Sequence, residues 1–188
     1  MPPKTIIHLL SGGLDSVTLM HHLLDEGHSV HCVLFNYHQA HAQELLWAKS
    51  ACHKRNVMFT TVDLPELGGL TDASWIVPFR NPIMLTLAVN LAVKAGADTV
   101  TIGCNADDAD EFPDCRWAVI DALNHAIKLS GYSIEICAPF IQRRKAYIGA
   151  LAQQMGLKTS DFWSCYRGGA NPCGECPACK KLNAAMTT

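Results

Sequence analysis

The sequence predicts a Rossmann-like α/β fold, in which a doubly wound, parallel sheet of five strands carries helices on both faces. Two observations predict it. Short apolar segments of strand length alternate with longer segments of helical periodicity, which is typical of a parallel sheet. Glycines follow the helical segments at the position where a helix ends in a left-handed residue. At 188 residues, with 49% hydrophobic and 17% charged side chains, the chain is long enough to bury one core.

The elements follow one another in a regular order. Strands are expected at residues 5–9, 29–36, 57–63, 99–104 and 133–137, and helices at residues 15–26, 40–55, 82–95, 116–130 and 144–155. The first, third, fourth and fifth helices end before Gly27, Gly96, Gly131 and Gly156. Pro82 fits the first turn of the third helix. Backbone N–H groups in a first turn have no carbonyl partner within the helix, so the N–H that proline lacks costs no hydrogen bond there. The connections at residues 64–75 and 105–114 are expected to be loops.

The turn between the first strand and the first helix carries the clearest functional pattern, Leu10-Ser11-Gly12-Gly13-Leu14-Asp15-Ser16. Adjacent glycines let backbone amides approach a ligand that a Cβ would exclude, and the start of the next helix favours a phosphate group. Ser11 and Ser16 add hydroxyl donors, and Asp15 can hold Mg²⁺ or the loop itself. The pattern indicates that these seven residues bind the phosphates of ATP, without the Walker signature. A plain turn capped by Asp15 and Ser16 is the structural alternative.

Charge and hydropathy limit the partners. The net charge is −2, and the densest basic run is the short segment 143–145, so we expect no direct contact with nucleic acid, which binds basic faces. A small-molecule substrate is favoured instead. No apolar stretch reaches the roughly 20 residues that cross a bilayer, and residues 1–4 lead into a strand without a signal-peptide core. These observations predict a cytoplasmic protein that does not contact membranes.

Four of the nine cysteines cluster near the C-terminus, at Cys165, Cys173, Cys176 and Cys179. Four thiolates at about 2.3 Å form a closed, tetrahedral Zn²⁺ site. A [4Fe–4S] cluster is the alternative, because ferredoxin sequences also begin with two-residue cysteine spacings; there the fourth cysteine follows downstream, whereas Cys165 lies upstream. We therefore expect a nucleotide-binding domain at residues 1–158 and a zinc-binding tail at residues 159–188, packed on the same domain. The metal would replace the core that so short a tail lacks.

Together the loop and the cysteine tail resemble the 7-cyano-7-deazaguanine synthase (QueC/ExsB) family of pyrophosphate-loop ATP pyrophosphatases. Further segments that resemble this family cover nearly the whole chain, at residues 36–45, 64–69, 77–81, 103–106, 112–116 and 164–179. The chain departs from the family pattern in four places, one of which is a shorter tail after Cys179. Phe79 stands where the family has Gly, which predicts a different backbone there; the stretch between Gly69 and Val77 is shorter; and residues 107–111 are more acidic.

The resemblance implies an adenine nucleotide alpha-hydrolase-like fold and a ligase that makes 7-cyano-7-deazaguanine from 7-carboxy-7-deazaguanine and ammonia. ATP and Mg²⁺ would adenylate the acid and then the amide, releasing AMP or ADP with pyrophosphate or phosphate. We expect Asp15, Arg80 and Lys145 to act on the phosphates. Asp108 and Asp114 are candidates for the deazaguanine ring, and Arg116 for the substrate carboxylate, a geometry suited to its planar guanidinium. The family also implies a homodimer.

Four other functions stay open. One is a different amide-forming relative, such as an ammonia-dependent NAD⁺ or GMP synthetase, although the cysteine tail counts against it. A divergent enzyme from a phage or a defence system would stop at the amide or serve a DNA or protein pathway. A tRNA-thiolating pyrophosphate-loop enzyme would need a basic face and cysteines near the nucleotide, whereas four of these thiols are in the tail. A nucleotide-binding module without turnover would keep the same loop.

Overall fold

The central strands bury side chains on both faces, as a parallel sheet between two helical layers requires. In the computed structural model, which describes residues 2–39, 42–70 and 77–187, five strands pair in the order β3-β2-β1-β4-β5, all parallel. Their bounds are β1 Thr5–Leu9, β2 Ser29–Asn36, β3 Met58–Asp63, β4 Thr99–Thr101 and β5 Glu135–Cys137. The predicted fold class is confirmed.

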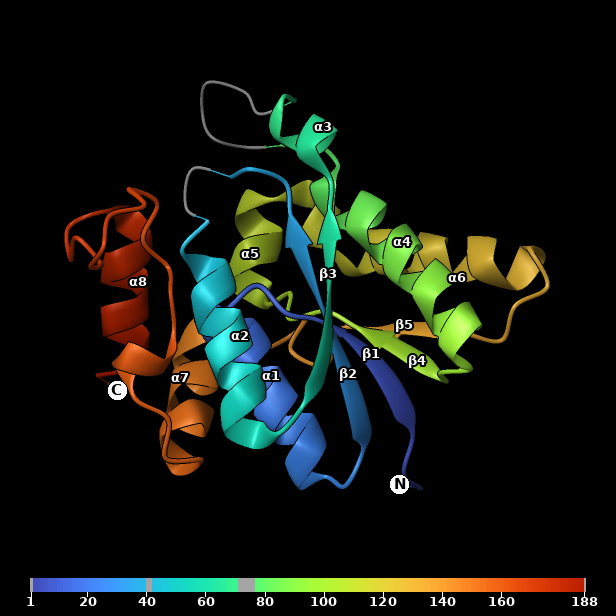
Figure 1. Ribbon diagram of the computed structural model, residues 1–188, viewed down its shortest axis with the longest axis horizontal. Helices are drawn as coiled ribbons and strands as arrows, with labels where there is room; N and C mark the ends of the chain where they lie inside the picture. Colours follow the sequence, from blue (N-terminus) through green and yellow to red (C-terminus); the bar gives the residue numbers. More distant parts are fainter. Residues whose placement is uncertain (1, 40–41, 71–76, 188) are drawn as a thin grey trace.

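Helices cover both faces of the sheet (Figure 1). One layer comprises α1 (Leu14–Asp25), α2 (Glu44–Arg55) and α7 (Lys145–Gln154), and its core includes Ile6 and Leu34 together with Leu19 and Ile148. The opposite layer comprises α4 (Arg80–Ala95) and α6 (Trp117–Leu129), which pack on strand residues such as Ile7. The C-terminal helix α8 (Pro177–Ala185) lies outside α7 as an additional layer.

Several predicted bounds need correction. The fourth strand ends at Thr101 rather than at residue 104, because the chain leaves the ladder after Ile102 donates to the Cys137 carbonyl oxygen. Gly103 then passes so close to α1 that an added Cβ would lie 3.0 Å from the Ser16 nitrogen. The second helix begins at Glu44; the residues 40–41 of that prediction lie outside the described residues.

The structure also contains short helices that the sequence interpretation assigned to loops or to the tail. They are α3 (Pro65–Gly68), α5 (Ala106–Glu111), the 3₁₀ turns η1 (Pro113–Cys115) and η2 (Thr159–Asp161), and α8. Residues 71–75 of the first predicted loop lie outside the described residues. Among the described helices, none is long and apolar enough to cross a membrane.

Phe79 precedes α4 with φ 59° and ψ 26°, in the left-handed region. This is a conformation that glycine adopts without steric cost and that other residues adopt with strain. The expectation that Phe79 gives a backbone different from that of the family therefore stays a prediction. The chain keeps a conformation suited to glycine there, and the 63% exposed phenylalanine ring extends from it.

Candidate functional site

The predicted phosphate loop joins β1 to α1 at the carboxyl edge of the sheet (Figure 1). Gly12 has a φ of 88°, and an added Cβ would lie 2.3 Å from the Glu44 carbonyl oxygen of α2. The hydroxyls of Ser11 and Ser16 lie 3.0 Å apart, and the Gly13 N–H donates to the Ser11 hydroxyl at 3.4 Å. Hydroxyls and backbone amides therefore meet at the start of α1, where an anion is stabilised.

A cluster of charged side chains lies beside this loop. Lys145, the first residue of α7, places Nζ 3.2 Å from an Asp15 carboxylate oxygen and 3.8 Å from one of Asp108. The Asn105 side-chain amide donates to both carboxylates, at 3.0 and 2.8 Å. The structure thus brings together Asp15 and Lys145, predicted to act on phosphates, with Asp108, predicted to contact substrate.

This cluster contains two carboxylates, Asp15 and Asp108, and one ammonium group, Lys145. Burial raises the pKa of Asp15, and burial also raises that of Asp108 to about 6, although Lys145 opposes both shifts. Burial would lower the pKa of Lys145, but the two carboxylates outweigh it and the pKa is raised. Two carboxylates that ionise reluctantly side by side form a place where a hard cation is stabilised.

A cavity of about 490 Å³ opens beside the loop, and a smaller one of about 140 Å³ adjoins it on the side of Lys145. Ser11, Asp15, Glu44 and Asp108 line both cavities. The two cavities are therefore neighbouring parts of one depression, of a size that holds a small organic ligand.

The larger cavity has its own set of polar residues. Arg80 and Asn81 of α4 line it together with Asp114 and Cys115 of η1. The Asn81 backbone N–H donates to Asp114 at 3.2 Å, and its side-chain amide donates to the Cys115 Sγ at 3.1 Å. Arg80 Nη1 donates to the Tyr37 hydroxyl at 2.9 Å. Arg80 and Asp114, both predicted from the sequence, thus share this chamber.

Among the charged side chains predicted for the site, Arg116 is the one that lines neither cavity. Its side chain is exposed, lines neither cavity, and donates from Nε to the Ala109 carbonyl oxygen at 3.1 Å. The expectation that Arg116 pairs with a substrate carboxylate is not supported by this position. Arg116 precedes the first residue of α6 in an extended conformation, from which its guanidinium reaches back to α5.

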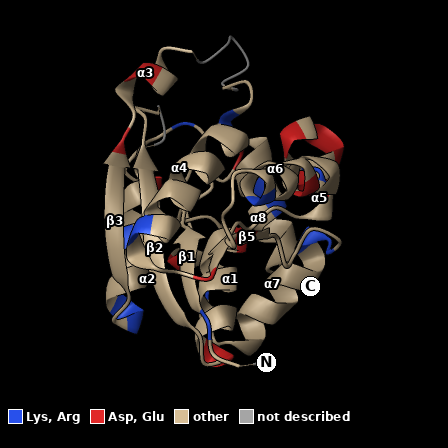
Figure 2. Ribbon diagram, turned by 90° about the vertical axis from the view of Figure 1, so that its right-hand side faces the viewer, with Lys and Arg blue, Asp and Glu red and all other residues tan. Residues whose placement is uncertain are grey.

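Four polar residues that line both cavities were missed as site residues: Glu44, Glu111, Tyr166 and Lys181. Lys181 of α8 pairs with Glu111 of α5, the acidic helix that Figure 2 shows in red. Glu44 was visible in the sequence within the family-like segment 36–45. Tyr166 was visible in the same way, within the family-like segment 164–179. For Lys181 no local signal exists, because only the packing of the tail brings it to the cavity.

Two buried thiols also lie in the larger cavity, Cys104 and Cys115. A hydrogen bond with Cys115, and burial, raise the pKa of the Cys104 thiol well above its ordinary value. The tail position of the cysteines was an argument against a thiolating enzyme, which needs cysteines near the nucleotide, and this argument needs correction because Cys104 and Cys115 line the cavity. A protonated thiol is nevertheless a poor nucleophile.

The four tail cysteines converge as predicted. The Sγ atoms of Cys165, Cys173, Cys176 and Cys179 all lie within 4.8 Å of one another. Backbone N–H groups donate to three of these sulfurs at 3.4 to 3.5 Å, and Gly174 turns the chain with a φ of 73°. The arrangement fits one metal ion surrounded by thiolates.

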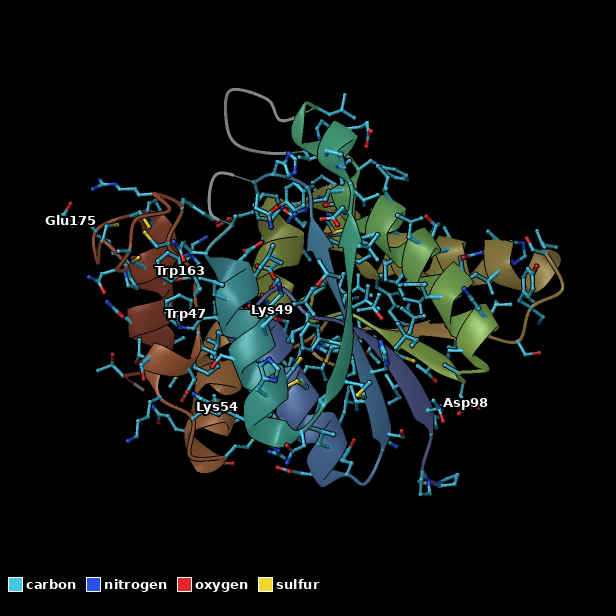
Figure 3. The ribbon with its side chains drawn as sticks, viewed as in Figure 1. Trp47, Lys49, Lys54, Asp98, Trp163 and Glu175 are labelled. Carbon is cyan, nitrogen blue, oxygen red and sulfur yellow. The ribbon has the colours of Figure 1, made fainter. Side chains whose placement is uncertain are left out.

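The tail is tied to the phosphate loop through tryptophans. The Trp163 backbone N–H donates to the Gly12 carbonyl oxygen at 2.9 Å, and its indole donates to the Cys165 carbonyl oxygen at 3.1 Å. Its ring packs on Trp47 of α2 with ring centroids 4.6 Å apart (Figure 3). The first cysteine of the cluster, Cys165, is thus two residues from Trp163, whose backbone N–H holds the loop.

The parallel sheet and the glycine-containing loop before α1 define the class of this protein: it has the fold of the pyrophosphate-loop ATP pyrophosphatases. The sequence profile of the queuosine biosynthesis protein QueC matches residues 5–76 and 71–188. The chain belongs to the QueC family.

Relatives called 7-cyano-7-deazaguanine synthase support this membership. The one from Hahella chejuensis is 33% identical over 198 residues, covering 94% of this chain and 86% of the relative. The one from Archaeoglobus fulgidus is 35% identical over 202 residues, covering 96% of this chain and 84% of the relative.

More distant structures show the fold alone. The chain superposes on the U34-tRNA thiolase NcsA of Methanococcus maripaludis with its [4Fe–4S] cluster at a TM-score of 0.56 and 15% identity, covering 98% of this chain and 63% of the thiolase. The NH3-dependent NAD synthetase of Campylobacter jejuni gives a TM-score of 0.58 at 17% identity, covering 86% of this chain and 68% of the synthetase.

Proposed function

We propose that this protein is an ATP-dependent ligase that converts 7-carboxy-7-deazaguanine and ammonia to 7-cyano-7-deazaguanine, a queuosine precursor. The observation that carries the proposal, beside family membership, is a single depression that joins the phosphate loop to a chamber with its own carboxylate, Asp114. That chamber accepts a base-sized ligand next to the phosphates, as transfer of AMP to a substrate oxygen requires.

The phosphate end supplies charge neutralisation. The loop from Leu10 to Ser16 binds the phosphates through its amides and hydroxyls, and Lys145 supplies a further positive charge beside them. Asp15 and Asp108 are the oxygen donors that suit Mg²⁺, which would neutralise charge on the departing pyrophosphate when bound. A Mg²⁺ ion held by Asp15 and Asp108 would engage these two carboxylates, which now pair with Lys145. Lys145 would then be available to contact the phosphates.

The chamber end supplies recognition. A carboxylate accepts hydrogen bonds from the N1–H and 2-amino groups of a guanine-like ring, and Asp114 is placed for this role. A base without those donors would leave the half-buried Asp114 carboxylate without hydrogen bonds from the ring, which costs binding free energy. Asp108 is committed to Asn105 and Lys145, so we assign it to the phosphate end. Arg80 lies in the same chamber as Asp114 and takes over the cationic role that Arg116 cannot fill.

The chemistry needs two activations. Transfer of AMP to the acid oxygen turns it into a leaving group; ammonia then forms the C–N bond while the C–O bond to AMP breaks. A second transfer of AMP, to the amide oxygen, allows loss of AMP and of both N–H protons, which leaves the nitrile.

For the tail we infer a structural Zn²⁺ ion. Four thiolates at about 2.3 Å from one tetrahedral ion lie roughly 3.8 Å from each other, close to the 4.0 Å between the Sγ atoms of Cys173 and Cys179. A [4Fe–4S] cluster binds each thiolate to a different iron and separates the sulfurs more widely. We expect one zinc per chain by elemental analysis and no absorption in the visible range. A brown protein containing iron and sulfide would contradict the assignment.

The remaining expectations stay proposals. We propose that residues 1–158 form the nucleotide-binding domain with residues 159–188 packed on it, that the enzyme works in the cytoplasm, and that it is a homodimer. The exposed apolar side chains of α6, Trp117 and Leu129, support an interface between copies. Light scattering gives the mass in solution, and a monomer at micromolar concentration would contradict the dimer.

Product analysis tests the function. Purified protein is incubated with Mg-ATP, ammonium and 7-carboxy-7-deazaguanine, and the base is followed by mass spectrometry. Carboxylate-dependent release of AMP together with the nitrile mass is expected. The amide as the final product would indicate the divergent alternative, and no carboxylate-dependent cleavage of ATP would refute the proposal.

A tRNA-thiolating enzyme is the second candidate, because Cys104 and Cys115 lie in the cavity. Under the proposed function the double variant with serine at both positions keeps nitrile synthesis within a few-fold. Loss of all turnover, with thiolated tRNA formed by the unmodified protein, would favour the second candidate instead.

A further inference from the structure

Glu44 occupies the junction between the two parts of the depression. It is the first residue of α2 and lines both cavities. Its backbone carbonyl packs against Gly12, so its position relative to the phosphate loop is fixed. The carboxylate group whose oxygen receives AMP must lie at this same junction, between the phosphates and the ring.

The Glu44 carboxylate accepts a hydrogen bond from a buried glutamine, Gln39. Gln39 is 7% exposed and donates from Nε2 to Glu44 Oε1 at 2.9 Å. The Gln39 Oε1 atom accepts from the Tyr37 N–H at 3.0 Å, so both ends of the amide are fixed. A buried glutamine with both ends fixed sets the orientation of the carboxylate that it contacts.

The protonation of Glu44 is tuned to neutral pH. Burial raises its pKa to about 7, while the hydrogen bond from Gln39 and the charge of Arg80 on α4 moderate the shift. Tyr37, on the segment after β2, is a further titratable group nearby, and the charge of Glu44 contributes to raising its pKa. A group with a pKa near the working pH both accepts and releases a proton readily.

The proposed reaction has a proton problem that the residues assigned above do not solve. Near neutral pH the nitrogen donor is ammonium, which has no lone pair to attack a carbonyl carbon. Lys145 and Arg80 are cations and repel ammonium, and Asp15 and Asp108 lie at the phosphate end.

We propose that Glu44 binds ammonium at the junction of the two cavities and takes its proton as the general base for amide formation; this rests on the proposed function. One N–H bond of ammonium breaks and its proton goes to a Glu44 carboxylate oxygen. The ammonia lone pair forms the C–N bond, and the C–O bond to AMP breaks with its electron pair on the phosphate oxygen. Glu44 releases that proton to solvent and accepts the second N–H proton, which leaves the neutral amide.

The test is Glu44→Gln, which keeps the hydrogen bond from Gln39 and removes the base. With ammonium at pH 7 we expect amide and nitrile formation to fall at least about 100-fold, as general-base removal does. With hydroxylamine, which is neutral at that pH, we expect hydroxamate formation within a few-fold of the unmodified enzyme. The residual ammonium activity should rise steadily with pH as free ammonia appears. Glu66→Gln, on exposed α3 outside both cavities, is the matched control.

The outcomes separate the two proposals. If the unmodified enzyme shows no carboxylate-dependent AMP, the proposed function fails. If that enzyme is active and Glu44→Gln keeps full activity with ammonium, Glu44 is not the base. If Glu44→Gln loses hydroxamate formation as strongly as amide formation, its role lies in adenylation or folding, and the inference is overturned.

Discussion

The contact between α7 and α8 gives the sharpest stability prediction. Gly149 of α7 is buried, and an added Cβ would lie 1.9 Å from the Ala185 carbonyl oxygen of α8. Real Cβ contacts are not shorter than 3.0 Å, so α8 must shift by about 1.1 Å, the difference between the two distances. We therefore expect Gly149→Ala to destabilise the protein, although alanine is the better helix former.

The magnitude follows from two opposing effects. Overpacking of a rigid contact costs about 1–3 kcal/mol, and the upper part of this range applies because the clash is between backbone and Cβ. Replacing Gly by Ala inside a helix gains about 1 kcal/mol. The net expectation is a loss of about 2 kcal/mol, or about 4–8 °C in the melting temperature of a chain of this size.

Thermal and urea denaturation measure this effect directly. Ala146→Gly, at an exposed position on the same helix, is the control and should lose only the propensity, about 1 kcal/mol. A Gly149→Ala variant as stable as the unmodified protein, or more stable, would refute the close packing of α8 on α7.

Three further expectations concern single side chains. Lys145→Met should lower kcat/KM for ATP cleavage at least about 100-fold, since it removes charge at the phosphates and leaves Asp15 without its partner; a change below 10-fold in AMP release would exclude this role. Burial lowers the pKa of His8 to about 4 in the folded protein, from its unfolded value of 6.5. The neutral, buried His8 therefore contributes about 3 kcal/mol to the free energy of unfolding. This contribution is present above pH 6.5 and is lost as the pH falls toward 4. His8→Asn should flatten that pH dependence in urea titrations while exposed His125→Asn should not, and equal slopes would contradict it. Phe79→Gly should gain up to about 1 kcal/mol by removing left-handed strain, and a loss of stability in the same titrations would show that its ring packs usefully.

Much of the fold was predictable because its strands and helices follow from local sequence patterns. The strand at residues 5–9 and the helix after it are fixed by apolar periodicity and by Gly12 and Gly13, which act within a few residues. The tail helix α8 was missed, although Pro177 at its first turn is a recognised start signal. The cysteines around it masked that signal, because metal ligands and helix positions overlap.

The candidate site was predictable only where one segment contains it. The loop residues and the tail cysteines are contiguous, and their chemistry is visible in the sequence. Lys181 and Tyr166 reach the cavity only through the packing of the tail, and Arg116 turns away because α6 begins one residue later. The direction in which such a side chain points depends on contacts between segments that are far apart in the sequence. The spacing of residues along the chain does not reveal these contacts.

The charge of the depression indicates what it binds. Among the described residues that line the two cavities, the carboxylates are Asp15, Glu44, Asp108, Glu111 and Asp114, and the cations are Arg80, Lys145 and Lys181. An excess of carboxylates disfavours a polyphosphate without Mg²⁺ and disfavours a polynucleotide backbone. The same excess favours ammonium, so the acidic lining fits a reaction that combines Mg-ATP with a small cationic nitrogen donor.

The link between the tail and the loop would give the proposed zinc ion a role beyond stability. Cys165 holds the Trp163 indole through its carbonyl oxygen, and the Trp163 backbone N–H donates to the Gly12 carbonyl oxygen. Release of that ion would free Cys165 and loosen Trp163, and Gly12 would then lose the hydrogen bond that orients its peptide. Because this chain of contacts is local, metal loss should weaken ATP binding before the sheet unfolds. The cysteine cluster is then part of the nucleotide site through its position as well as a substitute for a missing core.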